Sequence, residues 1–103
     1  MKLIMFTVFD VKAEAYLPPF FLPNESMAMR IFSDMAGDTD HQFGKHPEDY
    51  TLFKLGEFDD NSSKINMYKT APELVSTALQ AKSLNVEIPI DIKEAKLASI
   101  AGD

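Results

Sequence analysis

The stretch HPEDYTLFKLGEFDD, residues 46–60, decides the fold expected for this chain. Residues 50–58 alternate in the manner of a β-strand, in which successive side chains point to opposite faces. Pro47 interrupts the polar loop that leads into this strand, and Asp59 and Asp60 open a turn after it. The alternation predicts one face made of Tyr50, Leu52, Lys54, Gly56 and Phe58, and an opposite face made of Thr51, Phe53, Leu55 and Glu57.

Two more strands are predicted on either side of this stretch. Residues 59–63 (DDNSS) are turn-forming residues, and residues 64–68 (KINMY) follow them as a short strand, so that the two strands form a hairpin. Near the start of the chain, residues 3–9 (LIMFTVF) have the pattern of a strand that is apolar on both faces. Such a strand lies inside a sheet or is covered on both sides.

A first helix is predicted to run to about Ala36, with Asn24 as its N-cap. Gly37 stands where a left-handed C-cap residue would follow the helix. Three prolines between residues 18 and 23 predict that the segment before the helix has no regular structure. The apolar stripe expected to face the core consists of Met27, Ala28, Ile31, Phe32 and Met35.

A second helix is predicted from Thr70 to about Ser83. Thr70 and Glu73 have the spacing of a capping box, and Pro72 falls in the first turn, where its missing N–H costs nothing. The elements then follow the order strand, helix, strand, strand, helix. This order predicts an α+β fold, a small and mainly antiparallel sheet with two helices on one face.

The C-terminal segment has a different pattern. Val86, Ile88, Ile90 and Ile92 alternate with polar residues, and Pro89 permits only an edge strand or an extended arm. The arm either packs on its own domain or docks on a neighbouring subunit by strand addition, which predicts a homo-oligomer. We therefore expect one domain at residues 1–84, followed at residues 85–103 by an arm or edge strand with a short helix.

Length and composition predict an ordinary soluble intracellular protein. The chain has 103 residues, of which 46% are hydrophobic and 25% charged, as in a single globular domain. The absence of cysteine excludes disulfides, thiolate metal sites and cysteine nucleophiles. No segment approaches the roughly 20 apolar residues that span a bilayer, so no membrane partner is expected.

The sequence offers no pattern of a catalytic or cofactor site. His41 and His46 lie near Asp38, Asp40, Glu48 and Asp49, but their spacing matches no common zinc motif, and solvated loop residues are the better interpretation. The glycines form neither a phosphate-binding loop nor a dinucleotide fingerprint. We therefore expect a protein without enzymatic activity, metal or cofactor.

Aromatic and basic residues suggest one candidate nucleic-acid surface. Sheets that bind single strands stack bases on exposed aromatic rings beside lysines. The alternative is that the same rings form the core under the helices. The net charge of −6 opposes phosphate binding, because residues 38–60 alone carry seven acidic and two basic groups. The candidate surface consists of Tyr50, Lys54 and Phe58 with Lys64 and Lys69.

Three segments resemble the small nonstructural protein of gokushoviruses, the single-stranded-DNA bacteriophages of the Microviridae. They are FTVFDVKAEAYLPPFFLPNESMAMRIFSD (6–34), DHQFGKHPEDYTLFKLGEFDD (40–60) and KINMYKTAPEL (64–74). The resemblance implies a DNA-binding protein of the host cytoplasm that is absent from the mature virion. It further implies a role in turning genome replication toward single-strand synthesis and packaging. No catalytic residue comes with it.

Two classes of function follow. In the first, the chain regulates single-stranded genome production by binding single-stranded DNA, or by engaging a phage or host replication protein through its acidic residues 38–60. In the second, the chain is an oligomeric assembly module that does not contact DNA.

Overall fold

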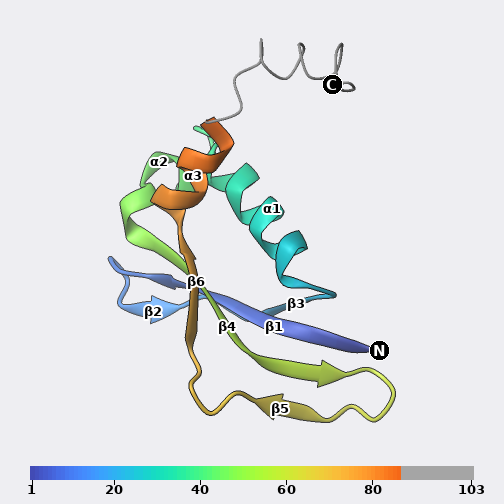
Figure 1. Ribbon diagram of the computed structural model, residues 1–103. Helices are drawn as coiled ribbons and strands as arrows, with labels where there is room; N and C mark the ends of the chain where they lie inside the picture. Colours follow the sequence, from blue (N-terminus) through green and yellow to red (C-terminus); the bar gives the residue numbers. More distant parts are fainter. Residues whose placement is uncertain (87–103) are drawn as a thin grey trace, which may run out of the picture.

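β4 (Tyr50–Asp59) occupies the centre of the sheet in the computed structural model, which describes residues 1–86 (Figure 1). One side of β4 pairs with β1 (Lys2–Asp10), and the other side pairs with β5 (Ile65–Met67) and β6 (Glu73–Thr77). The free side of β1 pairs with β2 (Ala15–Tyr16) and β3 (Phe20–Leu22). Every pairing is antiparallel, as predicted for the sheet.

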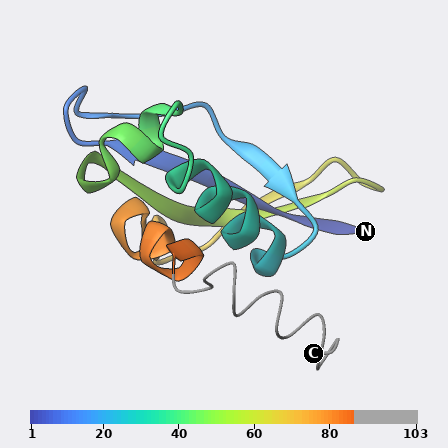
Figure 2. The same ribbon diagram turned by 90° about the horizontal axis from the view of Figure 1, so that it is seen from above.

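The helices lie on one face of this sheet, which confirms the predicted α+β class (Figures 1 and 2). α1 (Glu25–Ala36) and α3 (Ala78–Val86) contact each other above the strands. The short α2 (Gln42–Lys45) and the 3₁₀ turn η1 (Pro47–Asp49) lie beside them, in the segment that was predicted to be loop. Among residues 1–86, no helix combines the length and hydrophobicity needed to cross a bilayer.

The core lies between the helices and the sheet. Its largest fully buried apolar side chains are Phe6 from β1, Phe32 from α1 and Leu52 from β4. Phe43 from α2 closes one end, with its ring 5.5 Å from that of Phe32 and 4.6 Å from that of Tyr50. Burying side chains of this size stabilises the fold by about 1.5–3 kcal/mol each.

α1 begins as predicted but presents a somewhat different face. The Asn24 side chain accepts a hydrogen bond from the Met27 N–H at 2.9 Å and so caps the helix. Ala28, Phe32 and Ala36 are buried, whereas Met27 and Ile31 from the predicted stripe are each 39% exposed. Gly37 has φ −85°, so the predicted left-handed C-cap is wrong.

The proline-rich segment contains two short strands, contrary to the prediction that it would be irregular. Pro18 and Pro19 lie between β2 and β3, and Pro23 follows β3. β2 ends before Pro18 and β3 fits between Pro19 and Pro23, so both short strands pair with the edge of β1. Proline is excluded only where its N–H would be needed in a ladder.

The predicted start of the second helix at Thr70 is also wrong. The residues from Glu73 to Thr77 form β6, which pairs with β4, and α3 begins only at Ala78. A capping box does exist, but seven residues later: the Thr77 hydroxyl accepts from the Gln80 N–H at 3.1 Å, and the Gln80 side chain accepts from the Thr77 N–H at 3.2 Å. Thr70 and Glu73 contact each other outside any helix.

A β-bulge at Leu55 changes which side chains of β4 share a face. Met5 of β1 pairs with Gly56, and the adjacent Phe6 pairs with Lys54, so Leu55 is the extra residue. Beyond the bulge the alternation is inverted. Tyr50 and Lys54 therefore point toward the helices, whereas Phe58, which pairs with Leu3, points away from them, and the predicted shared face is wrong.

The predicted C-terminal arm falls largely outside the described residues. Val86 is the last residue of α3, rather than the first of an extended arm. Ile88, Ile90 and Ile92 lie outside the described residues.

Candidate interaction surface on the helix-free face of the sheet

Tyr50 is part of the core and is not available to stack a base. Its side chain is only 6% exposed, and its hydroxyl donates a hydrogen bond to Gln42 Oε1 at 2.8 Å. Burial raises the pKa of Tyr50, and the nearby charges of Asp10 and Asp49 raise it further. The ring therefore stays neutral and fixes α2 to β4.

Lys54 and Phe58, the other two residues of the predicted nucleic-acid surface on β4, lie on opposite faces of the sheet. The Lys54 ammonium is 2.8 Å from Glu25 Oε1 at the start of α1, and this hydrogen bond raises the pKa of Lys54. The Phe58 ring is 5.6 Å from that of Phe21 on the other face. The structure therefore does not bring Tyr50, Lys54 and Phe58 together.

The remaining two predicted residues, Lys64 and Lys69, are exposed and lie just before and just after β5. The Lys64 carbonyl accepts from the Asp59 N–H at 2.9 Å, which closes the hairpin turn. Lys64 lines a depression together with Lys2, Glu57 and Asp59, which lie on the helix side of the sheet, so its side chain does not join Phe58 on the opposite face.

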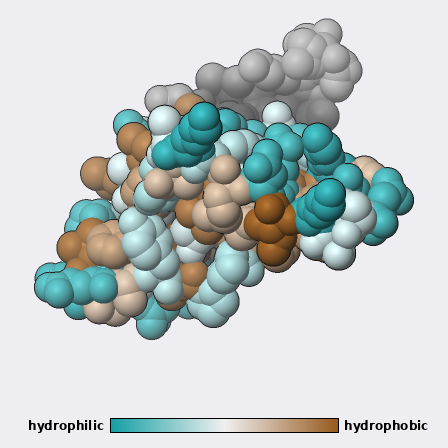
Figure 3. All heavy atoms as spheres, turned by 90° about the horizontal axis from the view of Figure 1, so that it is seen from below, coloured by the Kyte–Doolittle hydropathy of each residue, from teal (hydrophilic) through white to brown (hydrophobic). Residues whose placement is uncertain are grey.

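The sheet face opposite the helices carries exposed apolar side chains, and we call it the helix-free face. The strand registers place Phe21 opposite Met5, Leu74 opposite Phe53, and Met67 opposite Gly56, all on this side. Figure 3 views the molecule from this side, where apolar residues lie among weakly polar ones and strongly hydrophilic residues lie at several places around them. Its most exposed apolar members, between 40% and 64% exposed, are Tyr16, Phe21, Ile65, Met67 and Leu74.

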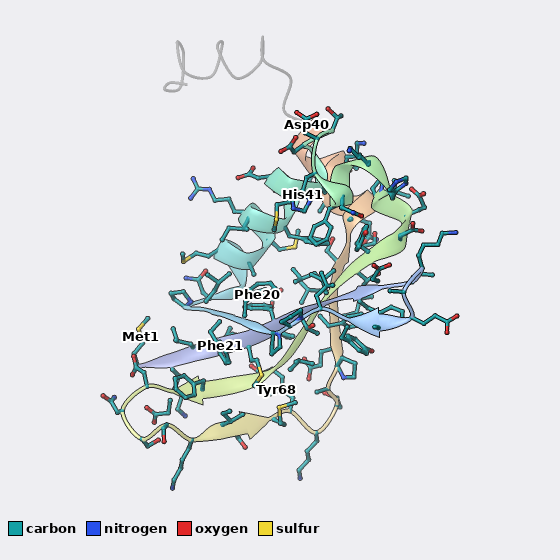
Figure 4. All side chains as sticks on the ribbon, turned by 180° about the vertical axis from the view of Figure 1, so that it is seen from behind. Met1, Phe20, Phe21, Asp40, His41 and Tyr68 are labelled. Atoms are coloured by element: carbon teal, nitrogen blue, oxygen red, sulfur yellow. The ribbon has the colours of Figure 1, made fainter. Side chains whose placement is uncertain are left out.

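Aromatic rings make two groups on the helix-free face. The Tyr16 ring lies 4.7 Å from Phe9 and 6.0 Å from Phe53, and Phe21 packs against Phe58. Phe20, the neighbour of Phe21 in β3, instead stacks on Phe6 at 5.7 Å on the helix side (Figure 4). Because Tyr16 and Phe21 belong to the segment predicted to be irregular, the sequence did not point to this surface.

No strand contributes a charge to the helix-free face. An antiparallel sheet with one solvated face normally places polar residues there. A contiguous exposed apolar surface is instead typical of an interaction site. Every charged residue within the six described strands occupies a register position on the helix side; these are Lys2, Asp10, Lys54, Glu57, Asp59 and Glu73.

The helix-free face is also hollowed. A depression of about 290 Å³ opens there, and the Thr7 hydroxyl at its floor donates to the Leu17 carbonyl at 2.6 Å, so that no polar hydrogen is left over. An apolar side chain from a partner would fit such a depression. Its lining consists of Thr7, Tyr16, Leu17, Pro19, Leu55 and Pro72.

Several acidic residues of the 38–60 segment have structural roles. Asp38 accepts from the Asp40 N–H at 2.9 Å, and Asp59 accepts from the Asn61 N–H at 2.9 Å. The latter bond lowers the pKa of Asp59. These carboxylates stabilise turns, and the acidic segment does not form a single surface patch.

The histidines separate in the structure. His41 Nδ1 accepts from the Phe43 N–H at 3.0 Å and so caps α2, at the end of the molecule where Figure 4 labels it beside Asp40. The potential ligand atoms of His46, Glu48 and Asp49 lie within 4.8 Å of one another, and Asp49 is buried although it was predicted to be solvated. All three come from one short turn, so any ion there would take most of its ligands from water.

Comparison with known proteins gives one match. A family model described as "Phage ORF5 protein" matches residues 3–81, which include the described strands except for the first residue of β1, and the start of α3. No curated protein and no solved structure matches the chain.

Proposed function

This chain belongs to the Phage ORF5 protein family, and on that premise we propose that it is a non-enzymatic protein of phage infection that acts by binding. Its resemblance to the small nonstructural protein of gokushoviruses supports a role in turning replication toward single-stranded genome synthesis and packaging. That role places the protein in the host cytoplasm and outside the mature virion. The working surface in this proposal is the helix-free face, which binds an apolar protein surface.

One observation carries the proposal: the helix-free face is exposed and apolar, and no charged residue of a strand lies on it. A face of this kind gains free energy when it leaves water, by roughly 25 cal/mol per Å² of apolar area. Within residues 1–86, its strands place on it no charged group that would bind a phosphate, a carboxylate or a metal ion. Binding through apolar contact is therefore the chemistry that these residues support best.

The distribution of charge favours a protein over DNA as the partner. Phosphate contacts by lysine and arginine supply most of the affinity of nucleic-acid binding. Here the net charge is −6, and Lys54, the only lysine of β4, is already paired with Glu25. A phage or host replication protein that exposes an apolar patch would be a suitable partner.

Single-stranded DNA is the second candidate ligand, and the aromatic rings of the helix-free face favour it. Exposed rings such as Tyr16 and Phe21 could each stack one base, which is worth about 1–3 kcal/mol per base. In this version Lys64 and Lys69, at the rim near β5, would contact phosphates. The candidate rings thus differ from those expected from the sequence, and Tyr50 has no part.

Complementation of a phage that lacks this gene tests the proposal. Host cells would supply the wild-type chain, Leu74→Glu or Leu79→Glu, and single-stranded genomes would be quantified relative to double-stranded replicative DNA. Leu74 and Leu79 are 64% and 56% exposed, but Leu74 lies on the helix-free face and Leu79 on α3. We expect Leu74→Glu to reduce single-stranded genomes at least tenfold, and Leu79→Glu to leave them unchanged.

Equal activity of the two variants at equal protein levels would remove the helix-free face from the function. Electrophoretic shift of a labelled single-stranded oligonucleotide at low salt decides between the two ligands. A shift that Tyr16→Ala weakens favours DNA, and no shift at micromolar protein favours a protein partner.

A further inference from the structure

We propose that the helix-free face binds the same face of a second copy of this chain, giving a two-fold symmetric dimer in which two sheets pack face to face. The proposal rests on the proposed function, because it names a second copy, in place of a replication protein, as the apolar protein surface that this face binds. Two antiparallel sheets pack in this way in β-sandwiches, about 10 Å apart and with strand directions within about 30°. The helices of both copies would then lie on the outside.

The exposed area is large for a monomer of this size. Tyr16, Phe21, Ile65, Met67 and Leu74 are 51%, 40%, 57%, 51% and 64% exposed. Since a large side chain of this kind buries about 150–250 Å² when fully covered, these five alone expose roughly 500 Å². This sum over five side chains is comparable to the largest single apolar patch on a typical monomer, about 300–600 Å².

The half-buried rings between these side chains extend the patch. Phe9, Phe53 and Phe58 all face the same side and are each partly accessible. A stable interface of standard size needs about 800 Å² from each partner. The five most exposed side chains supply roughly 500 Å² of this area, and the three half-buried rings add to it.

Charge argues that the occupant is a second copy rather than a charged partner. Two chains of net charge −6 repel each other in most orientations. Face-to-face contact is the orientation in which no charged strand residue enters the interface, because all of them lie on the helix side. A basic partner would find no acid on this face, whereas an identical face offers a neutral apolar surface of matching size.

The arrangement of side chains along the face suits a two-fold axis. Phe21, Phe58 and Met67 lie toward the start of β1, whereas Tyr16 and Leu74 lie toward its end. A two-fold axis that runs across the strands, between the two sheets, exchanges these two ends, so that the first group of one copy packs on the second group of the other. The depression beside Tyr16 would receive an apolar side chain from the opposing group.

Light scattering and analytical ultracentrifugation of the full chain, from about 1 to 200 µM, test the proposal. We expect a mass of twice 11.6 kDa. Leu74→Glu should raise the dissociation constant at least 100-fold, because a symmetric dimer would bury two unpaired carboxylates. Leu79→Glu, the matched control on α3, should change it less than about threefold.

A second variant keeps the test independent of folding. Met67 is 51% exposed on β5, and the chain contains no cysteine, so Met67→Cys introduces a single thiol. A spin label attached to this thiol should become less mobile as the protein concentration rises through the dissociation constant of the dimer. Unchanged urea unfolding curves of the dilute Leu74→Glu chain would show that a lost dimer does not reflect lost structure.

A monomeric wild-type chain over the whole concentration range would overturn the proposal, as would a dimer that Leu74→Glu leaves intact. If the label at position 67 is immobile in such a monomer, residues 87–103 are the occupant instead. The proposed function is tested separately, because the complementation experiment measures single-stranded genomes and not the oligomeric state. A monomer whose Leu74→Glu variant still loses activity keeps the function and rejects only the dimer.

Discussion

Gly56 allows β5 to pass closely over β4. A Cβ at this position would lie 2.4 Å from the Asn66 carbonyl oxygen and 2.8 Å from the Met67 Cα. Both atoms belong to the backbone of β5, so neither can move away without shifting the strand. Glycine is thus required here for its lack of a side chain rather than for an unusual backbone conformation.

Gly56→Ala should therefore lower the free energy of unfolding by about 1–3 kcal/mol, as overpacking does elsewhere in proteins. Chemical denaturation followed by circular dichroism measures the change. Gly37→Ala is the matched control, since Gly37 has φ −85°, which any residue adopts. We expect the control to stay within about 0.5 kcal/mol of the wild type. Equal losses for the two variants would contradict the importance of the β4–β5 contact.

At the scale of single residues, the sequence predicted the N-cap of α1 but neither the C-cap at Gly37 nor the faces of β4. Asn24 was recognisable because its signal lies within one turn of the chain. The opposite orientations of Lys54 and Phe58 were not recognisable, because the bulge at Leu55 depends on how β4 aligns with β1. The register between β1 and β4 depends on two distant segments, so the alternation within β4 alone does not predict it.

At the scale of elements, the start of α3 depends on Thr77. Its hydroxyl and the Gln80 side chain satisfy each other's backbone N–H groups at the first turn. Thr77→Ala should cost about 1 kcal/mol of stability, the typical loss of an N-cap. Thr70→Ala, the same substitution at an exposed site outside any helix, should cost less than about 0.5 kcal/mol. Thermal or urea denaturation of both variants measures the difference, and a larger loss at Thr70 would refute the assignment of the cap.

The misplaced start of this helix shows why short elements are hard to predict. Thr70, Pro72 and Glu73 carry every local signal of a helix N-terminus. The residues from Glu73 to Thr77 nevertheless form a strand, because they pair with the edge of β4. The hairpin of β4 with β5 was predicted because its turn and both strands are contiguous in the sequence.

At the scale of the whole molecule, the charged residues of the described strands lie on one side of the sheet and its exposed apolar side chains on the other. The class of fold followed from the order of elements, but this separation did not, because it requires knowing which face the helices leave open. The helix-free face is assembled from all six described strands, including two in a segment that was expected to be irregular.

The separation predicts how self-association responds to salt. Because the interface would contain no charged strand residue while each copy has a net charge of −6, added salt should only screen repulsion. We expect the dissociation constant of the dimer to fall by no more than about threefold between 50 and 500 mM NaCl, measured by sedimentation. A tenfold weakening would mean that charged contacts hold the copies together. DNA binding would weaken far more steeply over the same range.

The pairing of β1 with β4 has a consequence for the time order of synthesis. The paired residues are 40 to 57 positions apart, from Asp10 with Tyr50 to Lys2 with Asp59. At about 5–20 residues per second, a ribosome needs roughly 2–10 s to add the partner after β1 has been made. During that interval the apolar residues of β1 have no β4 to pair with. Translation speed, and not only stability, therefore sets how long the nascent chain is open to aggregation.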